Sequence, residues 1–163
     1  MNRRNILMYA GLSTVLLGVG ARSMRAETEA FEIMKTEAEW KALLTPEQFA
    51  VLREEDTERP FTSPLNEEKR KGSYNCAGCD LPLYASETKF ESGTGWPSFF
   101  DVLPNAVGKK EDDTLFTTRT EIHCRRCGGH IGHVFEDGPK PTGLRYCMNG
   151  VAMKFVPGEA GPS

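Results

Sequence analysis

The sequence predicts a mainly β domain of antiparallel strands, with helices packed on it at the N-terminal side. Helical periodicity is confined to residues 27–55. From about Ser73 onward, short alternating segments are separated by Gly, Pro, Asn and Asp at close intervals, and no whole unit repeats. With 163 residues, of which 39% are hydrophobic and 26% charged, the chain has the size and composition of one globular domain.

Residues 1–26 have the pattern of an export signal. Arg3 and Arg4 precede an apolar run over residues 6–19, which is shorter than the about 20 residues of a membrane span and suits a secretory leader. The two arginines and the apolar pair that follows resemble a twin-arginine leader. We expect a periplasmic or otherwise exported protein with no stable membrane association after leader cleavage. The alternative is an uncleaved leader that anchors the protein in the inner membrane.

The charge balance argues against nucleic acid as a partner. The formal net charge is −3. Without residues 1–26, whose charged side chains are four arginines, 16 basic residues face 23 acidic ones and the net charge is −7. Proteins that bind phosphate backbones normally carry a basic surplus.

Two helices are predicted between Glu27 and Glu55. Thr36 and Glu39 have the spacing of a capping box, in which each side chain satisfies a free backbone donor of the other. Thr45 can cap a second helix directly afterwards, and Pro46 then occupies a first position that needs no donor. Apolar residues follow both starts at helical spacing, so each helix has one face to pack.

The rest of the chain is predicted to form strands, followed by a loose tail over residues 157–163. In the last predicted strand, Val151, Met153 and Phe155 alternate and would point to one side. The predicted strands cover residues 114–118, 121–123, 133–136 and 151–155.

Four of the five cysteines form two Cys-x-x-Cys pairs, Cys76 with Cys79 and Cys124 with Cys127. Four thiolates match the tetrahedral shell of a structural zinc site. The alternatives are two disulfides or a redox-active Cys-x-x-Cys pair, and the matched second pair favours zinc. Oxidising compartments favour disulfides, but a twin-arginine leader carries proteins already folded, with metal loaded beforehand.

Cys147 is left alone, as either an inert core residue or a reactive nucleophile. His130 and His133 lie in a segment whose glycines permit close backbone approach. An imidazole titrates near neutral pH and can protonate a developing oxyanion. The alternatives are histidines hydrogen-bonded for structure, or a His-x-x-His metal pair that has no apparent third ligand.

A third cluster surrounds Trp96 in the string Gly-Thr-Gly-Trp-Pro-Ser-Phe-Phe. Alone, this string is a turn flanked by core aromatics. Beside a reactive sulfur and two imidazoles, it can form an apolar wall for a small substrate group.

Four motifs occur together between Trp40 and Phe155: Cys-x-x-Cys, Ser-Gly-x-Gly-Trp-Pro-Ser-Phe, Cys-x-x-Cys-Gly-x-His-x-Gly-His-Val-Phe-x-Asp-Gly and Arg-Tyr-Cys-x-Asn. In this order they resemble the peptide-methionine (R)-S-oxide reductases, the MsrB family. The resemblance implies a domain over residues 36–156 with two antiparallel sheets of the β-tent type and a structural zinc away from the active centre. It also implies reduction of methionine (R)-S-oxide, free or within proteins, in the repair of oxidised proteins.

The resemblance further implies a role for each site residue. Cys147 would attack the sulfoxide sulfur and remain as a sulfenic acid, and Arg145 would stabilise its thiolate. Trp96 would hold the substrate methyl group, with Phe135 as its neighbour. Four residues would bind the sulfoxide oxygen and help protonate it: His130, His133, Asn149 and Asp137.

The chain departs from many members of this family because it has no cysteine to spare for resolving the sulfenic acid. We therefore expect an external reductant, either thioredoxin-like or a low-molecular-weight thiol. Two other functions are considered: a zinc-ribbon binding module, which would tolerate Cys147→Ser, and a peroxide-responsive sensor, which would not act on methionine sulfoxide. The acidic balance argues against a nucleic-acid-binding ribbon, and Trp96 argues against the sensor.

Overall fold

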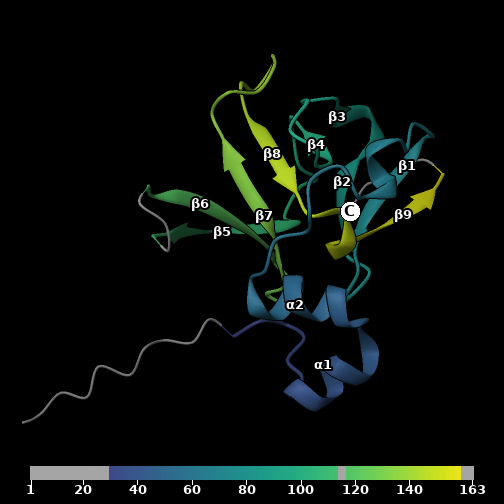
Figure 1. The fold of residues 1–163 in the computed structure, drawn as a ribbon, viewed down its shortest axis with the longest axis vertical. Helices are drawn as coiled ribbons and strands as arrows, with labels where there is room; N and C mark the ends of the chain where they lie inside the picture. Colours follow the sequence, from purple (N-terminus) through teal and green to yellow (C-terminus); the bar gives the residue numbers. More distant parts are fainter. Residues whose placement is uncertain (1–29, 114–116, 159–163) are drawn as a thin grey trace, which may run out of the picture.

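The computed structural model describes residues 30–113 and 117–158, and in these residues nine strands form two antiparallel sheets. The smaller sheet has the order β2-β1-β9 and the larger the order β3-β4-β8-β7-β6-β5 (Figure 1). The predicted fold class is confirmed. The strands are β1 Gly72–Cys76, β2 Pro82–Ala85, β3 Lys89–Phe90, β4 Ser98–Phe99, β5 Val107–Asp112, β6 Arg119–Cys124, β7 His130–Phe135, β8 Arg145–Met148 and β9 Met153–Pro157.

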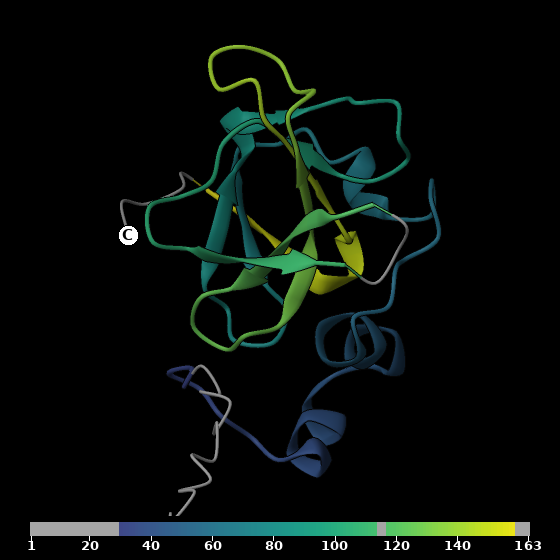
Figure 2. The same cartoon turned by 90° about the vertical axis from the view of Figure 1, so that its left-hand side faces the viewer.

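Two short helices, α1 Glu37–Leu43 and α2 Pro46–Glu54, lie on one side of both sheets (Figures 1 and 2). Both predicted starts are confirmed: Thr36 and Thr45 each complete a capping box. Capping side chains satisfy backbone donors that a helix cannot satisfy itself, so these starts are encoded locally. None of the helices within the described residues is long and apolar enough to cross a membrane.

Three single 3-10 turns complete the elements, and one of them corrects the last predicted strand. The backbone N–H of Ala152 donates to the carbonyl of Asn149 at 3.2 Å, which places Val151 in a turn and not in a strand. The strand therefore begins at Met153. The three turns are η1 Pro64–Asn66, η2 Ser86–Thr88 and η3 Gly150–Ala152.

Other predicted boundaries also differ from the structure. Residues 121–123 lie in β6, while β7 begins at His130, three residues before its predicted start, and ends at Phe135. The predicted strand over residues 114–118 is wrong for Thr117 and Thr118. The pairing of Asp112 with Arg119 in antiparallel register makes the chain reverse between β5 and β6. Residues 114–116 lie outside the described part of the chain.

Both predicted terminal segments extend beyond the described residues. The expected leader at residues 1–26 lies wholly outside them, as do residues 159–163 of the expected tail. The start of that tail is corrected, because Pro157 ends β9 in register with Gly72. The N–H of Gly158 also donates to the carbonyl of Lys71 at 3.1 Å.

Aromatic side chains from both sheets form the centre of the core. Tyr84 of β2 stacks on Phe99 of β4 with ring centroids 4.3 Å apart, and Tyr74 of β1 meets the same ring edge-on at 4.9 Å. All three side chains are fully buried. The Tyr84 hydroxyl donates to the Met148 sulfur at 2.9 Å, which ties the core to the strand that carries the lone cysteine.

Candidate active site and metal centre

A small pocket with a volume of about 120 Å³ opens over the central strands β7 and β8. It brings together five of the residues that the sequence singled out, from three separate stretches of chain. Three further lining residues were not predicted. The predicted residues in the pocket wall are Trp96, His133, Phe135, Cys147 and Asn149, and the additional ones are Thr57, Arg119 and Gly132.

Strand alternation turns Cys147 toward this pocket. Its neighbours on β8, Tyr146 and Met148, are buried in the core, and successive side chains in a strand point to opposite faces. Cys147 is half-buried, and it is paired in register with Ser98 on one side and with His133 on the other. The thiol is therefore held next to an imidazole by backbone pairing and remains accessible from the pocket.

His133 is held by a carboxylate. Its Nε2 lies 2.7 Å from Oδ2 of Asp112, and the same oxygen accepts from Nη2 of Arg119 at 2.6 Å. Burial lowers the pKa of His133 from the ordinary value of 6.5, and the hydrogen bond to Asp112 opposes that effect only in part. The imidazole is thus neutral at pH 7. Because a carboxylate only accepts, Nε2 carries the hydrogen and Nδ1 is left as a base.

His130 lies behind His133 and does not line the pocket. Its side chain is 3% exposed, and its Nδ1 lies 2.9 Å from Oε1 of Glu121. Burial would raise the pKa of Glu121, but the hydrogen bonds and charges of His130 and Lys110 lower it overall. The His130 and His133 rings meet edge-on with centroids 5.4 Å apart. His130 can therefore orient His133, but the structure gives it no direct access to this pocket.

Arg145 and Asp137 form a bidentate ion pair beside the pocket. Nε and Nη2 of Arg145 lie 2.8 and 2.9 Å from the two carboxylate oxygens of Asp137. These hydrogen bonds raise the pKa of Arg145, with a smaller contribution from the charge of Cys147. The guanidinium also covers the Phe135 ring, 4.4 Å from its centroid. Asp137 is exposed, so it acts on the site through Arg145.

The loop after α2 forms the wall opposite β7. The Trp96 indole N–H donates to the Glu58 carbonyl at 2.8 Å, and Oδ1 of Asn149 accepts from the Glu58 backbone N–H at 3.0 Å. The Asn149 amide also donates to the Ile131 carbonyl at 3.0 Å. These bonds fix Trp96 and Asn149 in the pocket wall and place Thr57 beside them.

The unpredicted members of the site had unequal signals in the sequence. Arg119 and Glu121 are charged residues two positions apart on β6, and Glu121 is only 4% exposed. Charged residues that alternate along a half-buried strand are unusual and could have been noticed. Thr57 had no such signal, because its place depends on how the next residue, Glu58, bonds to Trp96 and Asn149, which are 38 and 91 positions away from Glu58.

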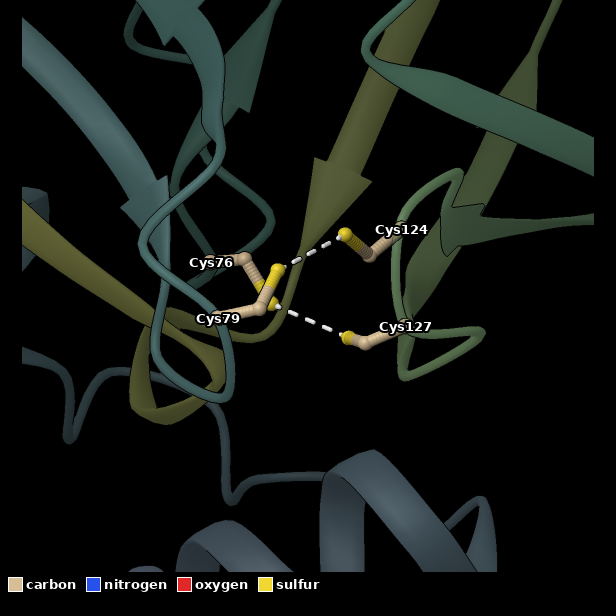
Figure 3. A group of neighbouring side chains, drawn as sticks. All are labelled: Cys76, Cys79, Cys124 and Cys127. Carbon is tan, nitrogen blue, oxygen red and sulfur yellow. Dashed lines mark hydrogen bonds between the residues drawn. The ribbon is translucent and has the colours of Figure 1, made fainter. Parts of the chain in front are cut away.

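The four cysteines of the two pairs converge at a second site (Figure 3). Each pair begins at the last residue of a strand: Cys76 ends β1 and Cys124 ends β6. All four Sγ atoms lie within 4.8 Å of one another, with 3.7 Å between Cys76 and Cys127 and 3.5 Å between Cys79 and Cys124. This group can hold a metal ion.

The sulfur separations fit a tetrahedral metal better than disulfides. Zn–S bonds of about 2.3 Å put tetrahedral ligands about 3.8 Å apart, whereas a disulfide joins sulfurs at about 2.0 Å. Hydrogen bonds among the thiols raise the pKa of Cys76 and Cys127 and lower that of Cys79 and Cys124. Among the described residues, no other group of three or more His, Cys, Asp or Glu side chains is placed to hold a metal ion, so the His-x-x-His pair belongs to no such group.

Strand β6 runs from the pocket at one end to the metal centre at the other. Arg119, at its first residue, lines the pocket, while Cys124, at its last, belongs to the metal centre. A strand rises about 3.3 Å per residue, so their Cα atoms lie about 16 Å apart. The metal centre therefore holds the ends of the sheets together and takes no part in the pocket.

A protein-family model described as "SelR domain" matches residues 44–157. The curated relatives include a peptide methionine sulfoxide reductase MsrB from Methanosarcina barkeri, 56% identical over 130 residues, which cover 79% of this chain and 92% of the relative. The protein of the same name from Agrobacterium fabrum is 56% identical over 127 residues, or 77% of this chain and 94% of the relative. That from Leptospira interrogans is 51% identical over 126 residues, or 77% and 96%.

Proposed function

We infer that this chain, which belongs to the MsrB family of peptide methionine sulfoxide reductases, reduces methionine (R)-S-oxide through a sulfenic acid on Cys147. The enzyme class follows from the family, and the thiol mechanism is our proposal. One observation carries it: Cys147 is the single cysteine outside the metal centre, and it lies in a pocket between Trp96 and His133.

The first step transfers an oxygen atom from substrate to enzyme. Nδ1 of His133 takes the thiol proton of Cys147, and the thiolate attacks the sulfoxide sulfur. The imidazolium returns the proton to the sulfoxide oxygen, which weakens the bond between sulfur and oxygen. The oxygen ends on Cys147 as a sulfenic acid and methionine leaves. The sulfoxide is reduced by two electrons and Cys147 is oxidised by two.

The other pocket residues bind and orient the sulfoxide. The rings of Trp96 and Phe135 offer an apolar surface to the methyl group, and Asn149 provides a fixed amide near the oxygen. Arg145 stabilises the thiolate by its charge, while Asp137 holds Arg145. His130 takes a supporting role, as the partner that orients His133 from behind.

The sulfenic acid is resolved by thiols from outside the chain. One external thiol condenses with it to form a mixed disulfide and water, and a second thiol releases Cys147 and leaves as a disulfide. We propose a thioredoxin-like protein or a small thiol as the reductant, because the other four cysteines lie together in the group that can hold a metal ion.

We propose zinc for the metal centre, held by Cys76, Cys79, Cys124 and Cys127. Four thiolates are the usual ligands of structural zinc, and the bound metal contributes folding free energy. Export through residues 1–26 to the periplasm also stays a proposal. The alternative is a leader that remains uncleaved and anchors the protein in the inner membrane.

The deciding experiment compares the wild type with Cys147→Ser on the separate R and S epimers of N-acetylmethionine sulfoxide, with a chemical dithiol as reductant. We expect turnover of the R epimer by the wild type alone and a trappable sulfenic acid on Cys147 when the dithiol is omitted. Unchanged turnover by Cys147→Ser would refute the mechanism. Rapid oxidation of Cys147 by peroxide without any sulfoxide turnover would favour the sensor instead.

A further inference from the structure

A second, larger hollow adjoins the sulfoxide pocket. Its volume is about 580 Å³, and Thr57 lines both spaces. Side chains of α2 and η3 form an apolar floor, which consists of Pro46, Ala50, Val51 and Val151. Three carboxylates and one guanidinium stand around it, those of Glu47, Asp56, Glu58 and Arg59. The hollow is therefore apolar at the bottom and net acidic at the edge.

The size of the sulfoxide pocket leaves most of a polypeptide substrate outside it. A space of about 120 Å³ accommodates the sulfoxide end of one methionine side chain, so the main chain and the neighbouring residues must lie on the surrounding surface. The adjoining hollow, across Thr57, is part of that surface.

Residues 56–62, here called the rim loop, form a rigid divider between the two spaces. Glu58 holds the loop by three bonds: its N–H donates to Asn149, its carbonyl accepts from Trp96, and its carboxylate accepts from the Val151 N–H at 3.2 Å. Two of these partners line the sulfoxide pocket and the third lines the hollow. A surface fixed in this way loses little entropy when a ligand binds.

Phe61, in the same loop, is an exposed aromatic residue that lies against Gly95. The residue is 73% exposed, and its backbone adopts φ = 64°. A bulky residue in this left-handed region is strained, and such strain is commonly retained at functional sites. The Phe61 N–H donates to the Gly95 carbonyl at 2.7 Å, which places the residue beside Trp96. Exposed aromatic rings on fixed backbone are frequent anchors in interfaces.

We propose that the rim loop and its hollow bind the polypeptide that flanks an oxidised methionine, with a preference for one apolar and one basic neighbour. The inference deepens the proposed function and rests on it. An apolar side chain next to the sulfoxide fills the floor at Ala50, while a lysine or arginine pairs with the acidic edge at Glu47 and Asp56. Phe61 contacts the chain on the other side of the loop. The residues next to the oxidised methionine are thus part of what the enzyme recognises.

The first test uses the wild type alone. The value of kcat/KM is measured for N-acetylmethionine (R)-S-oxide amide and for pentapeptides in which the sulfoxide is flanked by Leu and Lys, by two Gly, or by Leu and Glu. We expect the Leu/Lys peptide to exceed the amide by roughly tenfold, the order expected for burial of one leucine-sized side chain. The Gly and Glu peptides should fall between them. Equal values for all four substrates would overturn the proposal.

Two variants then locate the effect. Ala50→Leu places a bulkier side chain in the hollow, and Phe61→Asn replaces the aromatic ring by a residue that tolerates the left-handed backbone. Each should remove most of the preference for the Leu/Lys peptide and leave the amide within about twofold of the wild type, as expected for substitutions that touch no reacting group. Matched controls are Ala42→Leu on the exposed side of α1 and Met34→Asn, whose side chain is also 73% exposed.

The outcomes separate this inference from the proposed function. If the wild type turned over neither the amide nor the peptides, the thiol mechanism itself would be refuted. Normal turnover of the amide with no peptide preference would refute the docking surface alone. Equal loss with both substrates in Ala50→Leu and Phe61→Asn would also refute it, because a docking surface acts only on the larger substrate.

Discussion

His133 and Asp112 form a short polar contact at the candidate active site, with 2.7 Å between Nε2 and Oδ2. Asp112 lies on β5 and His133 on β7, so β6 passes between them and supplies Arg119 as the second partner of the same carboxylate oxygen. The contact fixes the ring orientation and the tautomer of His133. It leaves Nδ1 as the base that the proposed first step needs.

Asp112→Asn should impair catalysis without disturbing the fold. An amide can accept from Nε2 but carries less negative charge, and Arg119 loses its ion pair, so His133 is less well oriented and its imidazolium less stabilised. We expect kcat/KM to fall by roughly tenfold to a hundredfold, a part of what general acid–base catalysis contributes. The control is Asp113→Asn, which removes the charge of a neighbouring surface carboxylate that accepts from Thr118. Equal activity of both variants would contradict the assigned role.

The pH dependence of kcat/KM should have an acid limb below pH 6.5. Burial lowers the pKa of His133 from 6.5, and the base must be neutral to take the thiol proton, so activity falls as the pH drops through the lowered pKa. Asp112 raises that pKa, and Asp112→Asn should therefore move the limb to lower pH. Rates between about pH 5 and about pH 8 test this. A limb in Asp112→Asn at higher pH than in the wild type would show the sign to be wrong.

Features with a local signal were predictable from the sequence. The capping boxes at Thr36 and Thr45 are confirmed because a cap depends on residues three positions apart. The two Cys-x-x-Cys pairs meet as expected, although Cys76 and Cys127 are 51 positions apart, because four thiols are a rare and specific set. The strand predicted over residues 121–123 lies within β6, although the strand extends further at both ends.

Features that depend on distant contacts were not predictable. Val151 has the alternation of a strand residue, but its N–H is taken by the carboxylate of Glu58 in a turn. His130 and His133 belong to one motif in the sequence, but in the fold His130 contacts Glu121 and His133 contacts Asp112. Only His133 lines the pocket. Asp112 was missed for the same reason, because it belongs to no local motif, whereas Arg119 had a signal in its spacing from Glu121.

Loss of the metal should destabilise the whole domain. Zinc contributes on the order of 10 kcal/mol to small metal domains, which is comparable to a typical net stability of about 5–15 kcal/mol. Cys79→Ser should therefore lose zinc, and even a loss of about 3 kcal/mol lowers Tm by roughly 10 °C. Metal analysis and thermal unfolding by circular dichroism measure both effects.

The matched control for the metal is Cys147→Ser, which should retain one zinc ion per chain and the Tm of the wild type. This comparison separates a general effect of removing a thiol from an effect of the metal centre. Two disulfides in protein purified from the periplasm, detected by thiol counting, would refute the zinc assignment.

A thiol introduced at position 94 should convert the enzyme to internal resolution. The Thr94 hydroxyl lies 3.7 Å from the Cys147 sulfur, so a cysteine sulfur at this position needs only a small movement to reach the about 2.0 Å of a disulfide bond. After one turnover of Thr94→Cys without reductant, the new thiol should displace water from the sulfenic acid. Mass spectrometry would then find an intramolecular disulfide, whereas the wild type retains a sulfenic acid that a chemical trap detects.

Thr118→Cys, on the exposed connection between β5 and β6, should behave as the wild type. If Thr94→Cys instead accumulated the trappable sulfenic acid to the wild-type extent, Cys147 would not be oxidised in the conformation described here, because the distance between the two side chains leaves no other barrier to the bond.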